Sequence, residues 1–119
     1  MPVRLRPQPA TEVEAALARH AAGVTEPTDL RMLTKHFLAV LAERAPGGAL
    51  EVRVPPYAAV QCLPGVRHTR GTPPAVVETD PETWVAVASG ATTWAEAVDA
   101  GRVTASGERS DLGDHLPLR

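Results

Sequence analysis

The sequence predicts an α+β fold in which a five-stranded, mainly antiparallel sheet is covered by about five helices. Three observations lead to this prediction. Apolar residues recur at helical spacing over the first 44 positions, the spacing changes to two at Leu50, and prolines and glycines then divide the chain into short segments. Helices that precede a run of strands are typical of an α+β domain rather than of alternating β-α units.

The first helix is expected over residues 12–22. Residues 1–10 contain three prolines and form an extended lead-in, so we place a single domain over residues 11–119. Thr11 and Glu14 have the spacing of a capping box, in which a hydroxyl and a carboxylate satisfy free backbone N–H groups at a helix start. The box therefore predicts that Thr11 is the residue that caps this helix.

The second helix is expected from Pro27 to about residue 44 and is the longest apolar element. Proline suits the first helical turn because its missing N–H would have no partner there. Proline and glycine at 46–48 end the helix. Its apolar face is formed by Leu30, Leu33, Phe37, Leu38, Val40 and Leu41. This face is expected to lie on the sheet.

Four strands are expected next, each with alternating apolar and polar positions. Residues 50–54 form the first strand and residues 57–63 the second, and both have one apolar face. A Pro-Gly turn follows, and it leads to a third strand at 66–70 and a fourth at 75–79. Short turns between consecutive strands predict an antiparallel meander.

The C-terminal third is expected to hold two short helices, the last strand and a closing helix. Asp80 followed by proline is typical of a helix start, because the carboxylate accepts from the first backbone N–H groups. Thr93 and Glu96 have the spacing of a second capping box. The fifth strand is expected around Val103, and the closing helix over residues 110–116.

Composition and charge narrow the classes of function. A net charge of −2 and few aromatic residues give no reason to expect nucleic-acid binding. No apolar run is long enough to span a membrane, and the N-terminus lacks the apolar core of a secretory signal. Cys62 is the only cysteine, so no intramolecular disulfide can form, and we expect it to be a buried small hydrophobe. These features predict a cytoplasmic protein.

Three C-terminal segments carry a family resemblance: WAEAV at 94–98, GRV at 101–103 and SGE at 106–108, followed by Leu112. They resemble the closing signature of the sterol carrier protein type-2 superfamily. The segments VRVPPYAAVQC, HTRGTPP and VVETDPETW resemble a smaller, actinobacterial branch of it, the bacterial sterol-carrier orthologue family. The resemblance covers residues from about 30 to 118.

The resemblance implies a non-catalytic domain with a hydrophobic space between helices and sheet. In relatives this space takes fatty acyl chains or sterols, so we expect a lipid or another apolar or amphipathic small molecule as ligand, held between the helix at 30–44 and the sheet. The resemblance implies no catalytic residue and no cofactor. The apolar residues expected to line the site are Phe37, Leu41, Val60, Trp84, Val87 and Trp94.

Two other functions stay open. Related domains occur fused to helical bundles of the mycothiol-dependent isomerase type, where they are accessory domains. The chain would then have a filled core and act as a protein-interaction or accessory domain beside an enzyme in trans. The other alternative is an enzyme whose acid–base group is His68 or Glu78.

A basic cluster at 67–70 is the most polar candidate site. In a strand at 66–70, His68 and Arg70 would point to the same face, where they could hold the carboxylate or phosphate head of a ligand, with Glu78 on the neighbouring strand. The structural alternative, which we favour, is that His68 or Arg70 pairs with Glu78 or Asp80 and fixes the hairpin.

No metal site is predicted. His20, His36 and His115 are scattered along the sequence, and no C-x-x-C or H-x-x-x-H spacing occurs. The sequence likewise contains no glycine-rich phosphate loop and no G-x-S-x-G motif.

Overall fold

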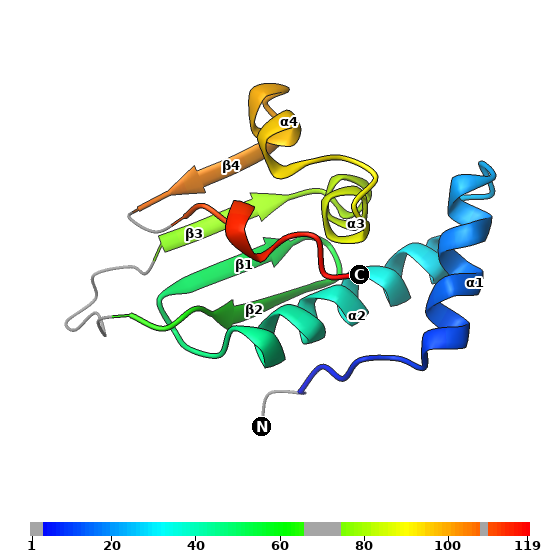
Figure 1. The fold of residues 1–119 in the computed structure, drawn as a ribbon, viewed down its shortest axis with the longest axis horizontal. Coiled ribbons are helices and arrows are strands. Elements are labelled where there is room, and N and C mark those ends of the chain that lie inside the picture. The colour runs from blue at the N-terminus through cyan, green and yellow to red at the C-terminus, as the bar shows by residue number, and fades with distance from the viewer. Residues whose placement is uncertain (1–3, 66–74, 108–109) are drawn as a thin grey trace.

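A computed structural model describes residues 4–65, 75–107 and 110–119 (Figure 1). Over these residues the chain forms four α-helices, four strands and one 3₁₀ turn, which confirms the α+β class. The elements in chain order are α1 (Ala10–Ala21), α2 (Pro27–Arg44), β1 (Leu50–Val54), β2 (Ala58–Cys62), β3 (Ala75–Thr79), α3 (Pro81–Ser89), α4 (Trp94–Asp99), β4 (Val103–Ser106) and the 3₁₀ turn η1 (Gly113–His115).

The sheet has the strand order β2-β1-β3-β4 and is mixed. The pairs β1–β2 and β3–β4 are antiparallel, but β1 and β3 are parallel, so the predicted meander is wrong. Alternating apolar residues look the same in either kind of pairing, and the sequence pattern therefore does not specify which strand is the neighbour. Four strands are described in place of the predicted five, and the strand predicted at 66–70 lies outside the described residues.

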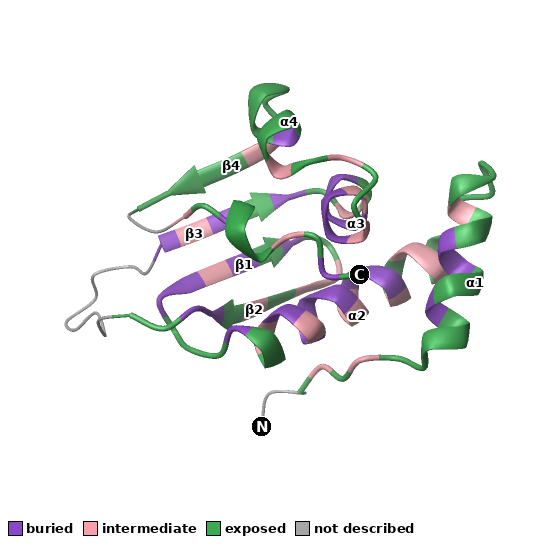
Figure 2. Cartoon of the chain, viewed as in Figure 1, coloured by how far each residue is buried: buried purple, intermediate pink, exposed green. Residues whose placement is uncertain are grey.

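One face of the sheet is buried and the other is open. Val52, Val54 and Val77 are wholly buried on the face that α2 and α3 cover. On the opposite face Arg53 and Glu78 are in register on neighbouring strands and are exposed. Burial is concentrated in β1, α2 and α3, whereas β4 and most of α4 are exposed (Figure 2).

Two of the three predicted caps are present in the structure. The Asp80 side chain accepts a hydrogen bond from the Thr83 backbone N–H at 2.8 Å, and α3 begins at Pro81. Thr93 and Glu96 form a reciprocal capping box at the start of α4. The box predicted at Thr11 is wrong: α1 begins earlier, so that Thr11 lies inside the first turn and the Pro9 carbonyl accepts from the first N–H groups.

The closing helix predicted at 110–116 is also wrong. Only the short turn η1 forms there, because Gly113 and Pro117 both oppose a regular helix. The tail is nevertheless anchored: Leu112 and Leu118 are buried, and the Leu118 N–H donates to the Ala88 carbonyl of α3 at 2.8 Å. It crosses the helix-covered side of the sheet as an irregular strap.

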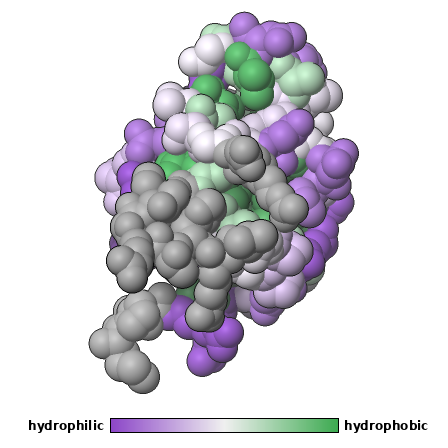
Figure 3. Space-filling view, turned by 90° about the vertical axis from the view of Figure 1, so that its left-hand side faces the viewer, coloured by the Kyte–Doolittle hydropathy of each residue, from purple (hydrophilic) through white to green (hydrophobic). Residues whose placement is uncertain are grey.

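Apolar surface is also visible outside the core. In the view from the end at which β2 finishes and β3 begins, apolar side chains lie beside a hydrophilic rim (Figure 3). Over the described part of the chain, no helix is long and apolar enough to cross a membrane.

Candidate functional site

The space between α2 and the sheet is filled by side chains. Phe37, Leu41 and Trp84 are at most 1% exposed and belong to one continuous core cluster. The indole Nε1 of Trp84 donates to the Thr34 carbonyl of α2 at 3.2 Å, which ties α3 to α2. Val87 of α3 is likewise 1% exposed and belongs to this cluster, so four of the six predicted lining residues are core residues.

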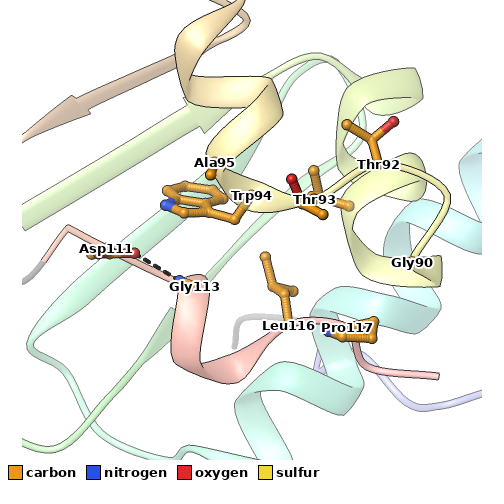
Figure 4. Close-up of a pocket in the computed structure, with 10 residues that line it drawn as sticks. Gly90, Thr92, Thr93, Trp94, Ala95, Asp111, Gly113, Leu116 and Pro117 are labelled. Atoms are coloured by element: carbon orange, nitrogen blue, oxygen red, sulfur yellow. Dashed lines mark hydrogen bonds between the residues drawn. The ribbon is translucent and has the colours of Figure 1, made fainter.

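A pocket of about 470 Å³ lies between the α3–α4 connection and the C-terminal strap (Figure 4). We call it the tail pocket. It contains two of the predicted lining residues, one from α3 and one from the start of α4. The lining residues are Val87, Gly90, Thr92, Thr93, Trp94, Ala95, Asp111, Gly113, Leu116 and Pro117.

Both walls of the tail pocket are fixed by local backbone chemistry. Gly90 ends α3 in the left-handed conformation at φ 93°, which a side chain would strain, and Thr93 then caps α4. On the other wall the Gly113 N–H donates to the Asp111 Oδ1 at 2.7 Å. In Figure 4 the side chain of Leu116 points from this wall toward Thr93 and Trp94. The pocket thus has walls that are set before a ligand arrives.

The lining combines apolar side chains with a few polar groups. Val87, Trp94 and Leu116 supply apolar surface, while Thr92 and Asp111 supply polar atoms. Asp111 is the only ionisable residue among the ten. Such a mixture is typical of small-molecule sites, where apolar surface supplies affinity and a few polar groups fix orientation.

Glu96 adds a negative charge at the rim. Its carboxylate accepts hydrogen bonds from the backbone N–H and the hydroxyl of Thr93, which itself lines the pocket. These bonds, the backbone one first, lower the pKa of Glu96 below its usual value. The carboxylate is therefore ionised at neutral pH.

Val60, the remaining predicted lining residue, lies elsewhere. It borders a depression of about 950 Å³ at the β2 edge, together with Leu5 of the lead-in and Ala39 of α2. The six predicted apolar residues are therefore divided between the core, the β2 edge and the tail pocket.

The predicted polar cluster is only partly described. His68 and Arg70 lie outside the described residues, so their pairing stays a prediction. Glu78 is exposed on the open face of the sheet and borders a shallow depression of about 330 Å³ with Arg53 and Tyr57. It does not line the tail pocket.

Burial shifts the pKa values of two titratable groups outside the tail pocket. Burial raises the pKa of Cys62 to about 11, so the thiol is protonated at neutral pH and is a weak nucleophile. Burial lowers the pKa of His36, whose Nδ1 accepts from the Gln8 backbone N–H at 2.9 Å. Among the described residues, no group of three or more His, Cys, Asp or Glu could hold a metal ion.

The strap residues were not expected at the site. The sequence predicts a closing helix for Asp111, Gly113 and Leu116, and nothing in their spacing indicates that they face Trp94. The available signal was the pair Gly113 and Pro117, which argues against a helix and for a chain that follows the surface.

Comparison with known families gives one clear match. A family model described as bacterial SCP ortholog matches residues 26–118, which is most of the chain. This match confirms the family resemblance noted in the sequence. A search of curated proteins finds no match.

Proposed function

Because the chain belongs to the bacterial SCP ortholog family, we propose that it binds a lipid or another apolar or amphipathic small molecule without converting it. The observation that carries this proposal is the tail pocket of about 470 Å³. Pockets of roughly 300–1,000 Å³ with apolar lining and a few polar groups are the usual small-molecule sites.

The tail pocket is a better location for the ligand than the space between α2 and the sheet. That space is occupied by Phe37, Leu41 and Trp84, and a ligand there would have to displace them. In the tail pocket an alkyl chain would contact Val87 and Leu116, and each buried methylene would contribute about 0.8 kcal/mol. Part of that gain offsets the entropy lost on association.

The filled core favours a second candidate function. A domain whose helices already fill the sheet face needs no ligand for stability, and it could act as an accessory or protein-interaction domain beside an enzyme in trans. This candidate differs from the first in one measurable respect, because it requires a stable protein partner and leaves the tail pocket empty. We further propose a cytoplasmic location, from the lone buried cysteine.

A blocking substitution in the tail pocket tests the proposed function. Ala95 is exposed and lines the pocket, so Ala95→Phe fills space there without disturbing the core. Ala18→Phe is the matched control, since Ala18 is an exposed helical alanine of α1 outside the pocket. The probe is dodecyl maltoside below its critical micelle concentration, with binding measured by calorimetry.

We expect the wild type and Ala18→Phe to bind the probe equally and Ala95→Phe to bind it at least ~10-fold more weakly, which corresponds to the loss of about two methylene contacts. Native mass spectrometry of the purified wild type would then show co-purified apolar mass. No binding to the wild type, or equal binding to both variants, would refute the proposal.

A further inference from the structure

Among the described residues that line the tail pocket, the formal charge is negative. None of the ten lining residues is arginine, lysine or histidine, and Asp111 is the only ionisable one. Glu96 supplies a second carboxylate, which accepts hydrogen bonds from the pocket-lining residue Thr93. His115, in the neighbouring turn η1, is exposed and does not line the pocket. A ligand in this pocket therefore meets negative charge.

Gly113 lies next to both the Trp94 ring and the Asp111 carboxylate. A Cβ at Gly113 would lie 3.0 Å from Asp111 Oδ1 and 3.5 Å from Trp94 Cδ1. The ring edge and the carboxylate therefore flank the same backbone position of the strap. Figure 4 shows Trp94 and Asp111 at the same end of the pocket, and Leu116 and Pro117 further along the strap.

The Asp111 carboxylate is held in place but retains binding capacity. Its Oδ1 accepts from the Gly113 N–H at 2.7 Å, which sets the side-chain direction. Its Oδ2 accepts no hydrogen bond from any residue in the described part of the chain. An oriented carboxylate with one free oxygen, beside an indole ring, matches an organic cation.

We propose that the tail pocket selects amphiphiles with an ammonium head group, primary or quaternary, which Asp111 and Trp94 hold while the alkyl chain lies against Val87 and Leu116. The ring quadrupole attracts a cation placed over its face, and the carboxylate adds Coulomb attraction at short range. A fatty-acid carboxylate would instead be repelled by Asp111. This inference rests on the proposed function and specifies the class of its ligand.

A head-group series at constant chain length tests the inference. The probes are dodecyltrimethylammonium, dodecyl maltoside and laurate, each below its critical micelle concentration, titrated calorimetrically at pH 7.5 and constant salt. For the wild type we expect the ammonium probe to bind at least ~10-fold more tightly than laurate, with dodecyl maltoside between them.

Two matched variants isolate Asp111 from the general negative charge of the protein. Asp111→Asn keeps an acceptor for the Gly113 N–H but removes the charge. We expect it to lower the affinity for the ammonium probe about 5–10-fold and to leave the affinity for dodecyl maltoside unchanged. Asp114→Asn removes an equal charge from the exposed turn η1, outside the lining, and should change nothing. Trp94→Leu keeps an apolar side chain and should lower the preference for ammonium.

The outcomes separate the two proposals. Binding of all three probes with equal affinity, unaltered by Asp111→Asn, overturns the head-group inference and leaves the proposed function standing. Tightest binding of laurate also overturns it, and a loss of that binding in Arg70→Ala would support the anionic head-group site predicted from His68 and Arg70. Binding of none of the probes overturns both proposals.

Discussion

The two tryptophans, ten positions apart, occupy opposite kinds of environment. Trp84 is wholly buried between α2 and the sheet, and its indole donates to the Thr34 carbonyl. Trp94 is half-buried at the start of α4 and lines the tail pocket. Both would count as core residues by hydrophobicity alone, but only the first stabilises the packing of helices on the sheet. The second leaves part of its ring exposed to the tail pocket.

On the proposed function, this difference places the residues for stability and those for binding in two regions of the fold. The α2–sheet interface is closed by large apolar side chains such as Phe37 and Leu41, which belong to one continuous buried cluster. The tail pocket is closed on one side by the C-terminal strap, which is anchored by the buried side chains of Leu112 and Leu118. Substitutions in the two regions should therefore change different observables.

The largest contrast is expected between Trp84→Ala and Trp94→Ala. Trp84→Ala should lower the free energy of unfolding by about 3–5 kcal/mol, because it opens a cavity and removes the hydrogen bond from the indole to the Thr34 carbonyl. Trp94→Ala should lower it by roughly 1 kcal/mol while weakening amphiphile binding. Urea denaturation measures the stability of both variants, and calorimetric titration measures their binding. Equal destabilisation by the two substitutions would contradict the assignment of Trp84 to the core and Trp94 to the pocket.

The caps of α3 and α4 allow the same comparison of the two regions, with smaller expected changes in the free energy of unfolding. Asp80→Ala should lower the free energy of unfolding by roughly 1–2 kcal/mol, because the Asp80 carboxylate accepts part-buried hydrogen bonds from both the N–H and the hydroxyl of Thr83. Thr93→Ala, in the exposed capping box of α4, should cost less stability but should loosen a wall of the tail pocket. Thermal unfolding ranks the stability of the two variants. A larger loss of stability for Thr93→Ala than for Asp80→Ala would contradict the assignment of the α3 cap to the more stabilising region.

Thr34 offers a substitution in the opposite direction. Its hydroxyl is buried and has no hydrogen-bond partner within the described residues. Thr34→Val removes the unpaired polar atom at nearly constant shape, and should raise the free energy of unfolding by about 1 kcal/mol. Thr34→Ala, which also removes a methyl group, serves as the control and should lower it. A decrease for Thr34→Val would show that the hydroxyl has a partner.

The smallest effect concerns His36 on the outer side of α2. Burial lowers its pKa in the folded protein, so folding favours the neutral ring, and its Nδ1 can accept from Gln8 only in that form. The sign follows: this contribution to stability is full above the unfolded pKa of ~6.5 and is lost as the pH falls through it. Melting temperatures at pH 8.0 and 5.5 should diverge less in His36→Gln than in the wild type. His115→Gln, at an exposed site, should leave the divergence unchanged.

Local chemistry in the sequence is sufficient to predict most elements. The Asp80-Pro81 start, the Thr93–Glu96 box and the strand at 50–54 all depend on neighbours in the chain, and each is present. The family could also be recognised from short segments and is confirmed. These features are predictable because their physical causes lie within a few residues.

The remaining features depend on partners that are distant in sequence. Alternation in β3 predicts a strand but not its parallel pairing with β1. The tail pocket forms because Leu116 and Gly113 of the strap meet Trp94 of α4, and no periodicity indicates that contact. Hydrophobicity likewise cannot distinguish Trp84 from Trp94, since both occur at helical spacing.

The position of a bound alkyl chain tests the central claim most directly. Intermolecular NOEs would be collected between dodecyltrimethylammonium and the wild-type protein with labelled valine and leucine methyl groups. We expect contacts from the chain to Val87 and Leu116 in the tail pocket. Contacts to Leu41 and Val52, which lie between α2 and the sheet, would contradict the account, because they would require the filled core to open for the ligand.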